Sequence, residues 1–291
     1  MKNNRKDLAT VLAFLIIPVV LLLLFSYYPI FKLIELSFSD WNGLSATYNY
    51  VGLENYKDIF SEPEIFKVFG NNMAYVIVAF IQQFAGLFLA ILLDSNLRGK
   101  KGFRAILFMP YIINGVAVAF MFNYMYDFTN GPINSILNSI GLGKYAVHWL
   151  SSSYFSNFSL AFISFWRYVG FTMVIFLAAL QSIPKEIYEA ARVDGAGFFK
   201  TVRFITFPNI KNMVSISLLL SINGSLQAYF EPFLITKGGP DGRTDTFITE
   251  SLSMAFKYQK FGKAAAMGII LIFIIIGIVM VQKAFLKEGD E

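Results

Sequence analysis

Residues 264–282 read AAAMGIILIFIIIGIVMVQ and contain no charged side chain. An α-helix rises about 1.5 Å per residue, so this stretch covers most of the roughly 30 Å hydrocarbon layer of a bilayer. Apolar runs in the core helices of soluble domains are usually only about 10–14 residues long. The segment therefore predicts a transmembrane helix.

Five further windows of similar length carry at most one charge each, namely residues 8–28, 72–93, 105–124, 158–180 and 213–236. Strands of a membrane β-barrel would be about ten residues long with strict alternation. The composition agrees, since 56% of the 291 residues are hydrophobic, 15% are charged and the mean hydropathy is +0.57. We expect an all-α integral membrane protein with six transmembrane helices, forming a single transmembrane domain over residues 1–291.

The placement of lysine and arginine predicts the orientation, because cytoplasmic loops retain these residues during insertion. With the N-terminus inside, the cytoplasmic segments hold 14 of them and the outer loops hold 8. Both termini are therefore expected in the cytoplasm. The first window is longer than the apolar region of a signal peptide and no Ala-x-Ala site follows it, so a retained helix is expected. Topology accounts for the net charge of +5, and no nucleic-acid partner is predicted.

The cytoplasmic loop at about residues 181–212 is longer than a connection between neighbouring membrane helices needs. Ser182 and Pro184 suit a helix start, because the hydroxyl can cap free amides and proline fits the first turn. The predicted helix covers residues 185–192, and Gly195 can supply the positive φ that ends it. A second short helix is expected over residues 197–205, stopped near Pro208.

Ala190 and Ala191 are expected to form an exposed pair of small side chains, flanked by Glu189 and Asp194. Another protein could approach such a helix closely while pairing with its acidic rim. The alternative is a solvated interfacial helix whose alanines merely favour helicity. The residue types alone leave both interpretations open.

Two motifs in this loop resemble the coupling loop of the membrane subunits of binding-protein-dependent ABC importers. EAARVDGA at residues 189–196 and ITFP at residues 205–208 match the family pattern of Glu-Ala-Ala, three residues, Gly, nine residues and Ile-x-Leu-Pro. Phe207 stands where leucine is usual. VGLENY at 51–56, QSIP at 181–184 and TKGGP at 236–240 further resemble the carbohydrate-uptake branch, of the maltose and multiple-sugar type.

The resemblance implies a permease in the bacterial plasma membrane that carries half of a sugar translocation path. The region around Trp41 resembles the first of the two permeases that pair in such importers. The implied partners are a second, homologous permease, two cytoplasmic ATPase subunits and an extracellular or periplasmic solute-binding protein. No cofactor is expected in this chain, since ATP and Mg would be bound by the ATPase.

The resemblance also implies roles for individual residues of the loop. Glu189 would pair with a basic residue in a groove of the ATPase, the alanine pair would allow close seating, and Gly195 would shape the turn. The predicted coupling residues are Glu189, Ala190, Ala191, Asp194, Gly195, Ile205 and Pro208.

Two charged residues lie inside predicted spans, Arg167 and Glu231. A charge in hydrocarbon costs several kcal/mol unless it faces protein or water, so both are candidates for the solute path. The alternative is an ion pair between them that fixes helix packing. In the fifth window Asn223, Ser225 and Gln227 form a polar patch that could hydrogen-bond solute hydroxyls.

In related sugar permeases the fourth and fifth helices contribute to the substrate cavity. Tyr168 adds an aromatic face suited to the C–H face of a pyranose ring, and Tyr111 and Asn114 on the third helix are further candidates. Hydrogen bonding between helices is the competing explanation for each polar residue.

Several chemistries find no matching residues. The chain has no cysteine and one histidine, His148, which we expect to be structural; no metal site is predicted. No Gly-x-x-x-x-Gly-Lys-Ser/Thr loop occurs, so this chain is not expected to hydrolyse ATP or to be an enzyme. An ion-coupled secondary carrier, a purely structural membrane subunit and import of a non-sugar solute such as a glycerol phosphate ester remain alternatives.

Overall fold

The computed structural model describes residues 3–95, 97–152 and 155–287. Its α-helices are α1 (Asn3–Leu22), α2 (Tyr28–Ser37), α3 (Glu54–Ser61), α4 (Pro63–Asp94), α5 (Lys100–Ile112), α6 (Gly115–Met125), α7 (Pro132–Ser139), α8 (Ser156–Gln181), α9 (Lys185–Val193), α10 (Phe198–Thr201), α11 (Phe207–Leu226), α12 (Phe247–Leu252) and α13 (Phe261–Lys287). The shorter turns are η1 (Leu23–Tyr27), η2 (Gly143–Tyr145), η3 (Val202–Thr206), η4 (Pro232–Thr236) and η5 (Ser253–Lys257). Within these described ranges the β-structure consists of one isolated bridge, between Ser39 and Tyr50. The all-α prediction is confirmed.

Five stretches of helix in the described part of the chain are long and apolar enough to span a membrane. They are Phe14–Ser37, Pro63–Asp94, Ser156–Gln181, Phe198–Leu226 and Phe261–Ala284. A sixth candidate is the bent pair α5 and α6. The predicted number of spans is therefore reached if that pair counts as one.

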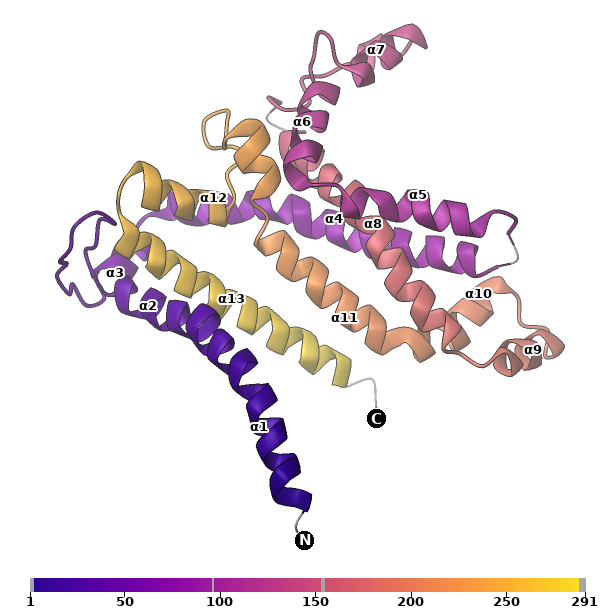
Figure 1. The fold of residues 1–291 in the computed structure, drawn as a ribbon. Coiled ribbons are helices and arrows are strands. Elements are labelled where there is room, and N and C mark those ends of the chain that lie inside the picture. The colour runs from indigo at the N-terminus through magenta and orange to yellow at the C-terminus, as the bar shows by residue number, and fades with distance from the viewer. Residues whose placement is uncertain (1–2, 96, 153–154, 288–291) are drawn as a thin grey trace. The chain divides into compact units, whose positions relative to one another are not determined.

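The third predicted span is not one continuous helix. Residues 105–124 fall on α5 and α6, which meet at an angle of 97° (Figure 1). Ile113 between them is extended, and the Asn114 side chain accepts a hydrogen bond of 2.9 Å from the Val116 N–H. Asparagine in this role starts a new helix, which local hydropathy does not register.

The fifth predicted span, residues 213–236, is shifted and interrupted. α11 ends at Leu226, residues 227–229 are non-helical, and the chain becomes helical again at Phe230 and continues into η4 at Pro232. The open carbonyls at the break find side-chain donors, as a helix end in a membrane requires. Asn72 Nδ2 donates to the Ser225 and Leu226 carbonyls at 2.9 and 3.3 Å, and the Thr246 hydroxyl donates to the Ala228 carbonyl at 2.6 Å.

The packing separates two compact units, residues 1–63 with 251–276 and residues 64–250 with 277–291. In the first unit, Lys263 is buried and forms an ion pair with Glu62 at 2.7 Å. The second unit contains two apolar core clusters and all of the predicted site residues. In this unit α8 packs closely on α5 at Gly170, which has no Cβ; a Cβ there would overlap the Leu107 carbonyl oxygen.

Candidate functional site: a polar cavity and a cytoplasmic helix

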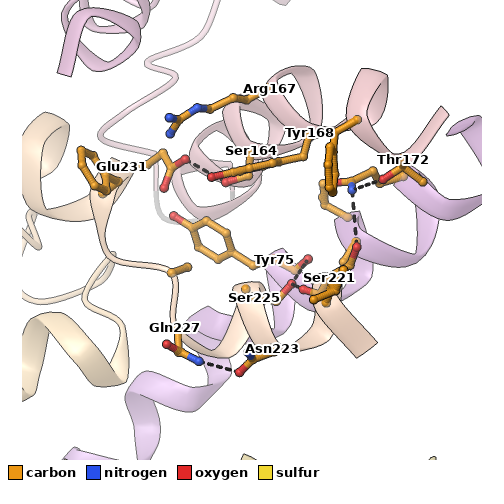
Figure 2. A pocket seen from close by; sticks show the side chains of 18 of the residues that line it. Tyr75, Ser164, Arg167, Tyr168, Thr172, Ser221, Asn223, Ser225, Gln227 and Glu231 are labelled. Atoms are coloured by element: carbon orange, nitrogen blue, oxygen red, sulfur yellow. Dashed lines mark hydrogen bonds between the residues drawn. The ribbon is translucent and has the colours of Figure 1, made fainter. Parts of the chain in front are cut away.

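A cavity of about 480 Å³ lies among α4, α5, α8, α11 and the segment after α11 (Figure 2). Its lining includes seven of the eight residues predicted for the solute path: Tyr111, Arg167, Tyr168, Asn223, Ser225, Gln227 and Glu231. The eighth, Asn114, is not in the lining and caps α6 instead. The sequence does not show that these residues lie together, because they come from α5, α8, α11 and the segment after α11.

Arg167 and Glu231 are the charged residues among those that line the cavity. Glu231 is only 7% exposed, and its Oε1 accepts a hydrogen bond of 2.8 Å from the Ser164 hydroxyl. No ion pair within 4.0 Å joins Arg167 to Glu231 in the described residues. The packing ion pair considered from the sequence is thus not formed in this structure.

A polar network on the wall was missed by the sequence analysis. Gln82 Nε2 donates to the Thr172 hydroxyl at 2.8 Å, and Gln83 Nε2 donates to the Ser221 hydroxyl at 2.7 Å. These bonds connect α4 to α8 and to α11. The available signal was the adjacent glutamine pair inside an otherwise apolar window, because buried amides in a membrane need partners.

The polar patch on α11 is divided between internal bonds and the cavity. The Ser225 hydroxyl donates to the Ser221 carbonyl at 2.8 Å, so part of its capacity is used within the helix. Gln227 is exposed and Asn223 is half-buried, and a hydrogen bond joins their side chains (Figure 2). The competing explanation, hydrogen bonding between protein groups, therefore holds in part for Ser225.

Aromatic side chains form another part of the wall. The rings of Tyr111 and Phe171 are stacked with centroids 4.6 Å apart, and Tyr168 meets Tyr111 edge-on at 5.9 Å. The cavity thus combines an aromatic surface with amides, hydroxyls and two charges. Pockets for small polar ligands have this mixture.

The cytoplasmic loop forms the predicted helix as α9. It ends in a Schellman motif, in which the Ala196 N–H bonds to the Ala191 carbonyl at 2.9 Å and the Gly195 N–H to the Arg192 carbonyl at 3.2 Å. Gly195 has φ +72°, as the sequence predicted. Glu189, Ala190 and Asp194 are exposed on the described surface.

Three details of the loop differ from the prediction. The Ser182 hydroxyl donates back to the Ala179 carbonyl at 2.7 Å and does not cap α9. Ala191 is buried, at 7% exposed, so the alanines are not an exposed pair. The chain also stays helical through Pro208, because the wide π turn η3 just before α11 accommodates the proline's missing N–H.

The loop is packed against the helices that carry the cavity. Ile183, just before α9, and Ile210 of α11 belong to one buried cluster with Phe176 of α8. The Tyr188 hydroxyl of α9 lies 3.3 Å from the Thr206 hydroxyl, within hydrogen-bonding distance. Ile205 is half-buried and Pro208 exposed, so these two predicted residues lie at the base of the loop.

The family model described as "Binding-protein-dependent transport system inner membrane component" matches residues 82–287. The chain belongs to this family. It is a multi-pass permease subunit of the inner membrane, and the matched region contains every coupling and path residue predicted from the sequence.

Individual relatives agree over nearly the whole permease. It is 32% identical over 279 residues to the probable ABC transporter permease protein YurN of Bacillus subtilis (strain 168), covering 95% of this chain and 96% of the relative. It is 31% identical over 279 residues to the multiple sugar-binding transport system permease protein MsmF of Streptococcus mutans serotype c, covering 96% and 95%.

A solved structure shares the fold. The permease matches a chain of a bacterial ABC transporter involved in the import of the acidic polysaccharide alginate, with a TM-score of 0.84 and 22% sequence identity. The match covers 99% of this chain and 98% of that chain. The overall fold of this permease is therefore one that a crystallised importer also has.

Proposed function

We propose that this permease forms half of the translocation path of an ATP-driven importer for a sugar or oligosaccharide. The observation that carries the proposal is the cavity, with its aromatic, amide and hydroxyl lining built on helices long enough to span a membrane. Hydroxyl groups both donate and accept hydrogen bonds, so such a wall suits a carbohydrate. The relatives named for multiple sugars and for diacetylchitobiose support this solute class.

The proposed assembly contains a second, homologous permease, two ATPase subunits and an external solute-binding protein. A related alginate importer has been solved in complex with a substrate-bound periplasmic protein, which supports the last of these partners. ATP and Mg would be bound by the ATPase subunits and not by this chain. Both termini would face the cytoplasm.

In this mechanism α9 is the coupling helix. Glu189, Ala190 and Asp194 present an exposed small and acidic surface to a groove of the ATPase, where Glu189 pairs with a basic residue. Ala191 is buried, and its small side chain lets α9 pack closely against the rest of the cytoplasmic loop. Because Ile183 and Ile210 share a core with α8, displacement of α9 by the ATPase would move the helices that carry the cavity.

Uptake into proteoliposomes tests the proposal. The importer assembled from both permeases and the ATPase subunits should take up a radiolabelled sugar only when two components are present. These are the binding protein and ATP on the side of the membrane where the ATPase subunits lie. Vanadate should stop uptake. Uptake by this chain alone, driven by a sodium or proton gradient, would instead establish a secondary carrier. Complexes without the ATPase subunits serve as the negative control.

A further inference from the structure

The two charges in the cavity are available for a solute, because no ion pair within 4.0 Å joins either of them to another side chain among the described residues. Arg167 Nε is buried and has no hydrogen-bond partner in the part of the chain that the structure describes. Its guanidinium carbon lies 5.4 Å from the centroid of the Tyr168 ring, and a Cβ at Gly115 would lie 3.0 Å from its Nη1. The arginine thus packs against apolar and aromatic neighbours and forms no ion pair within 4.0 Å in the described residues.

The polar ends of Arg167, Glu231 and Tyr75 lie on one side of the cavity (Figure 2). Tyr75 is 3% exposed, and its hydroxyl has no hydrogen-bond partner in the described chain. The side chain that hydrogen-bonds Glu231 is the Ser164 hydroxyl, which carries no charge. Buried polar groups are normally bonded, so two unbonded groups, Arg167 Nε and the Tyr75 hydroxyl, beside the Glu231 carboxylate indicate a site that is completed by a ligand.

A guanidinium and a carboxylate that form no ion pair with each other suit a hydroxylated ligand better than an acidic one. Guanidinium only donates hydrogen bonds and carboxylate only accepts them, whereas a hydroxyl does both. Neighbouring sugar hydroxyls can therefore accept from Arg167 and donate to Glu231. A carboxylate on the solute could accept from Arg167 but would be repelled by Glu231 across a low-dielectric site.

We propose that Glu231 selects against acidic sugars, so that with Arg167 it restricts the cavity to neutral saccharides. This inference rests on the proposed function and names the solute class of the same site. Arg167 attracts saccharides of both classes, and Glu231 decides between them. Like-charge juxtaposition is a common way in which binding sites reject a wrong ligand.

Binding can be measured directly on the permease, independently of selection by the binding protein. The chain has no cysteine, and a Cβ at Gly224 on the cavity wall meets nothing within 4 Å. Gly224→Cys therefore introduces a single labelling site that fits. In the assembled importer in nanodiscs, the rate of maleimide labelling of this chain would be followed against concentration for neutral disaccharides and for the same disaccharides with one ring oxidised to a uronic acid.

We expect neutral disaccharides to protect the cysteine at concentrations at least tenfold lower than their uronic acid counterparts, equivalent to about 1.4 kcal/mol. Glu231→Gln in the same background should bring the two classes to within about threefold by improving protection by the acid. Glu231→Asp, which keeps the charge, should retain the discrimination. Arg167→Gln should weaken both classes, and Lys144→Gln, outside the cavity, should match the parent ratio.

Equal protection by both classes in the Gly224→Cys parent, or an unchanged ratio in Glu231→Gln, would overturn the inference while leaving sugar transport intact. Absence of protection by any neutral or acidic disaccharide would overturn the proposed function itself. Size-exclusion profiles of the Glu231→Gln and Glu231→Asp complexes separate loss of selectivity from loss of assembly.

Discussion

At the residue scale, Gly195 occupies a backbone conformation that side chains with a Cβ rarely adopt. Its φ of +72° closes the Schellman motif at the end of α9, and a β-branched residue there would be strained by about 1–3 kcal/mol. We expect Gly195→Val to reduce ATP-driven uptake at least tenfold while the chain still inserts and assembles. Uptake and ATPase activity in proteoliposomes measure this.

Gly197 supplies a matched control two residues away. Its φ is −73°, and a Cβ there meets nothing within 4 Å, so Gly197→Ala should transport normally. Equal activity of the Gly195 and Gly197 variants would contradict the role of the α9 turn.

Glu189 is an exposed acid on the proposed ATPase-facing surface. If it pairs with a basic residue of the ATPase, Glu189→Lys places like charges together and should lower both uptake and solute-stimulated ATP hydrolysis at least tenfold. Glu186→Lys, also exposed on α9, is the matched control and should act more weakly. Unchanged uptake and ATP hydrolysis in the Glu189→Lys variant would contradict a contact between Glu189 and the ATPase.

At the element scale, Asn72 of α4 holds the broken end of α11. It is fully buried, donates to the Ser225 and Leu226 carbonyls, and accepts the Phe247 N–H at 3.3 Å. Asn72→Leu would leave buried backbone groups without partners, at about 1–3 kcal/mol each. We expect a lower midpoint of thermal unfolding for the detergent-purified complex.

Asn130 is an exposed asparagine in an outer segment, so Asn130→Leu should leave that midpoint within error. A midpoint for Asn72→Leu as high as that of the parent would mean that the α11 break is satisfied in another way.

At the scale of the whole molecule, alternating access predicts that the cavity opens to different sides as ATP is bound and hydrolysed. Single cysteines placed at residues 219–230 should fall into two groups, those whose labelling rate changes with the nucleotide state and those whose rate does not. Lining positions such as Asn223 and Gln227 should change their labelling rate several-fold between nucleotide-free and vanadate-trapped complexes, whereas Ile222, outside the lining, should not. Uniform rates along the segment would exclude these residues from the path.

Much of the fold was predictable because bilayer crossing depends on properties that are local in sequence. Apolar windows with at most one charge placed the spans near residues 72–93, 158–180 and 264–282, and the structure has helices there. The coupling helix and its Gly195 turn were predictable for the same reason, since capping acts over a few residues. The prediction that the helix stops near Pro208 was wrong, because the sequence shows the missing N–H of the proline but not the π turn η3 that precedes it.

The sequence by itself determined that this chain is a membrane permease, where its spans lie, and which charges fall inside them. Only the tertiary structure decided that Arg167 and Glu231 share a cavity without pairing, that Ala191 is buried, and that Asn72 bonds the end of α11. The reason is physical. Hydropathy and capping act between neighbours along the chain, whereas a cavity depends on distances between helices, which packing sets.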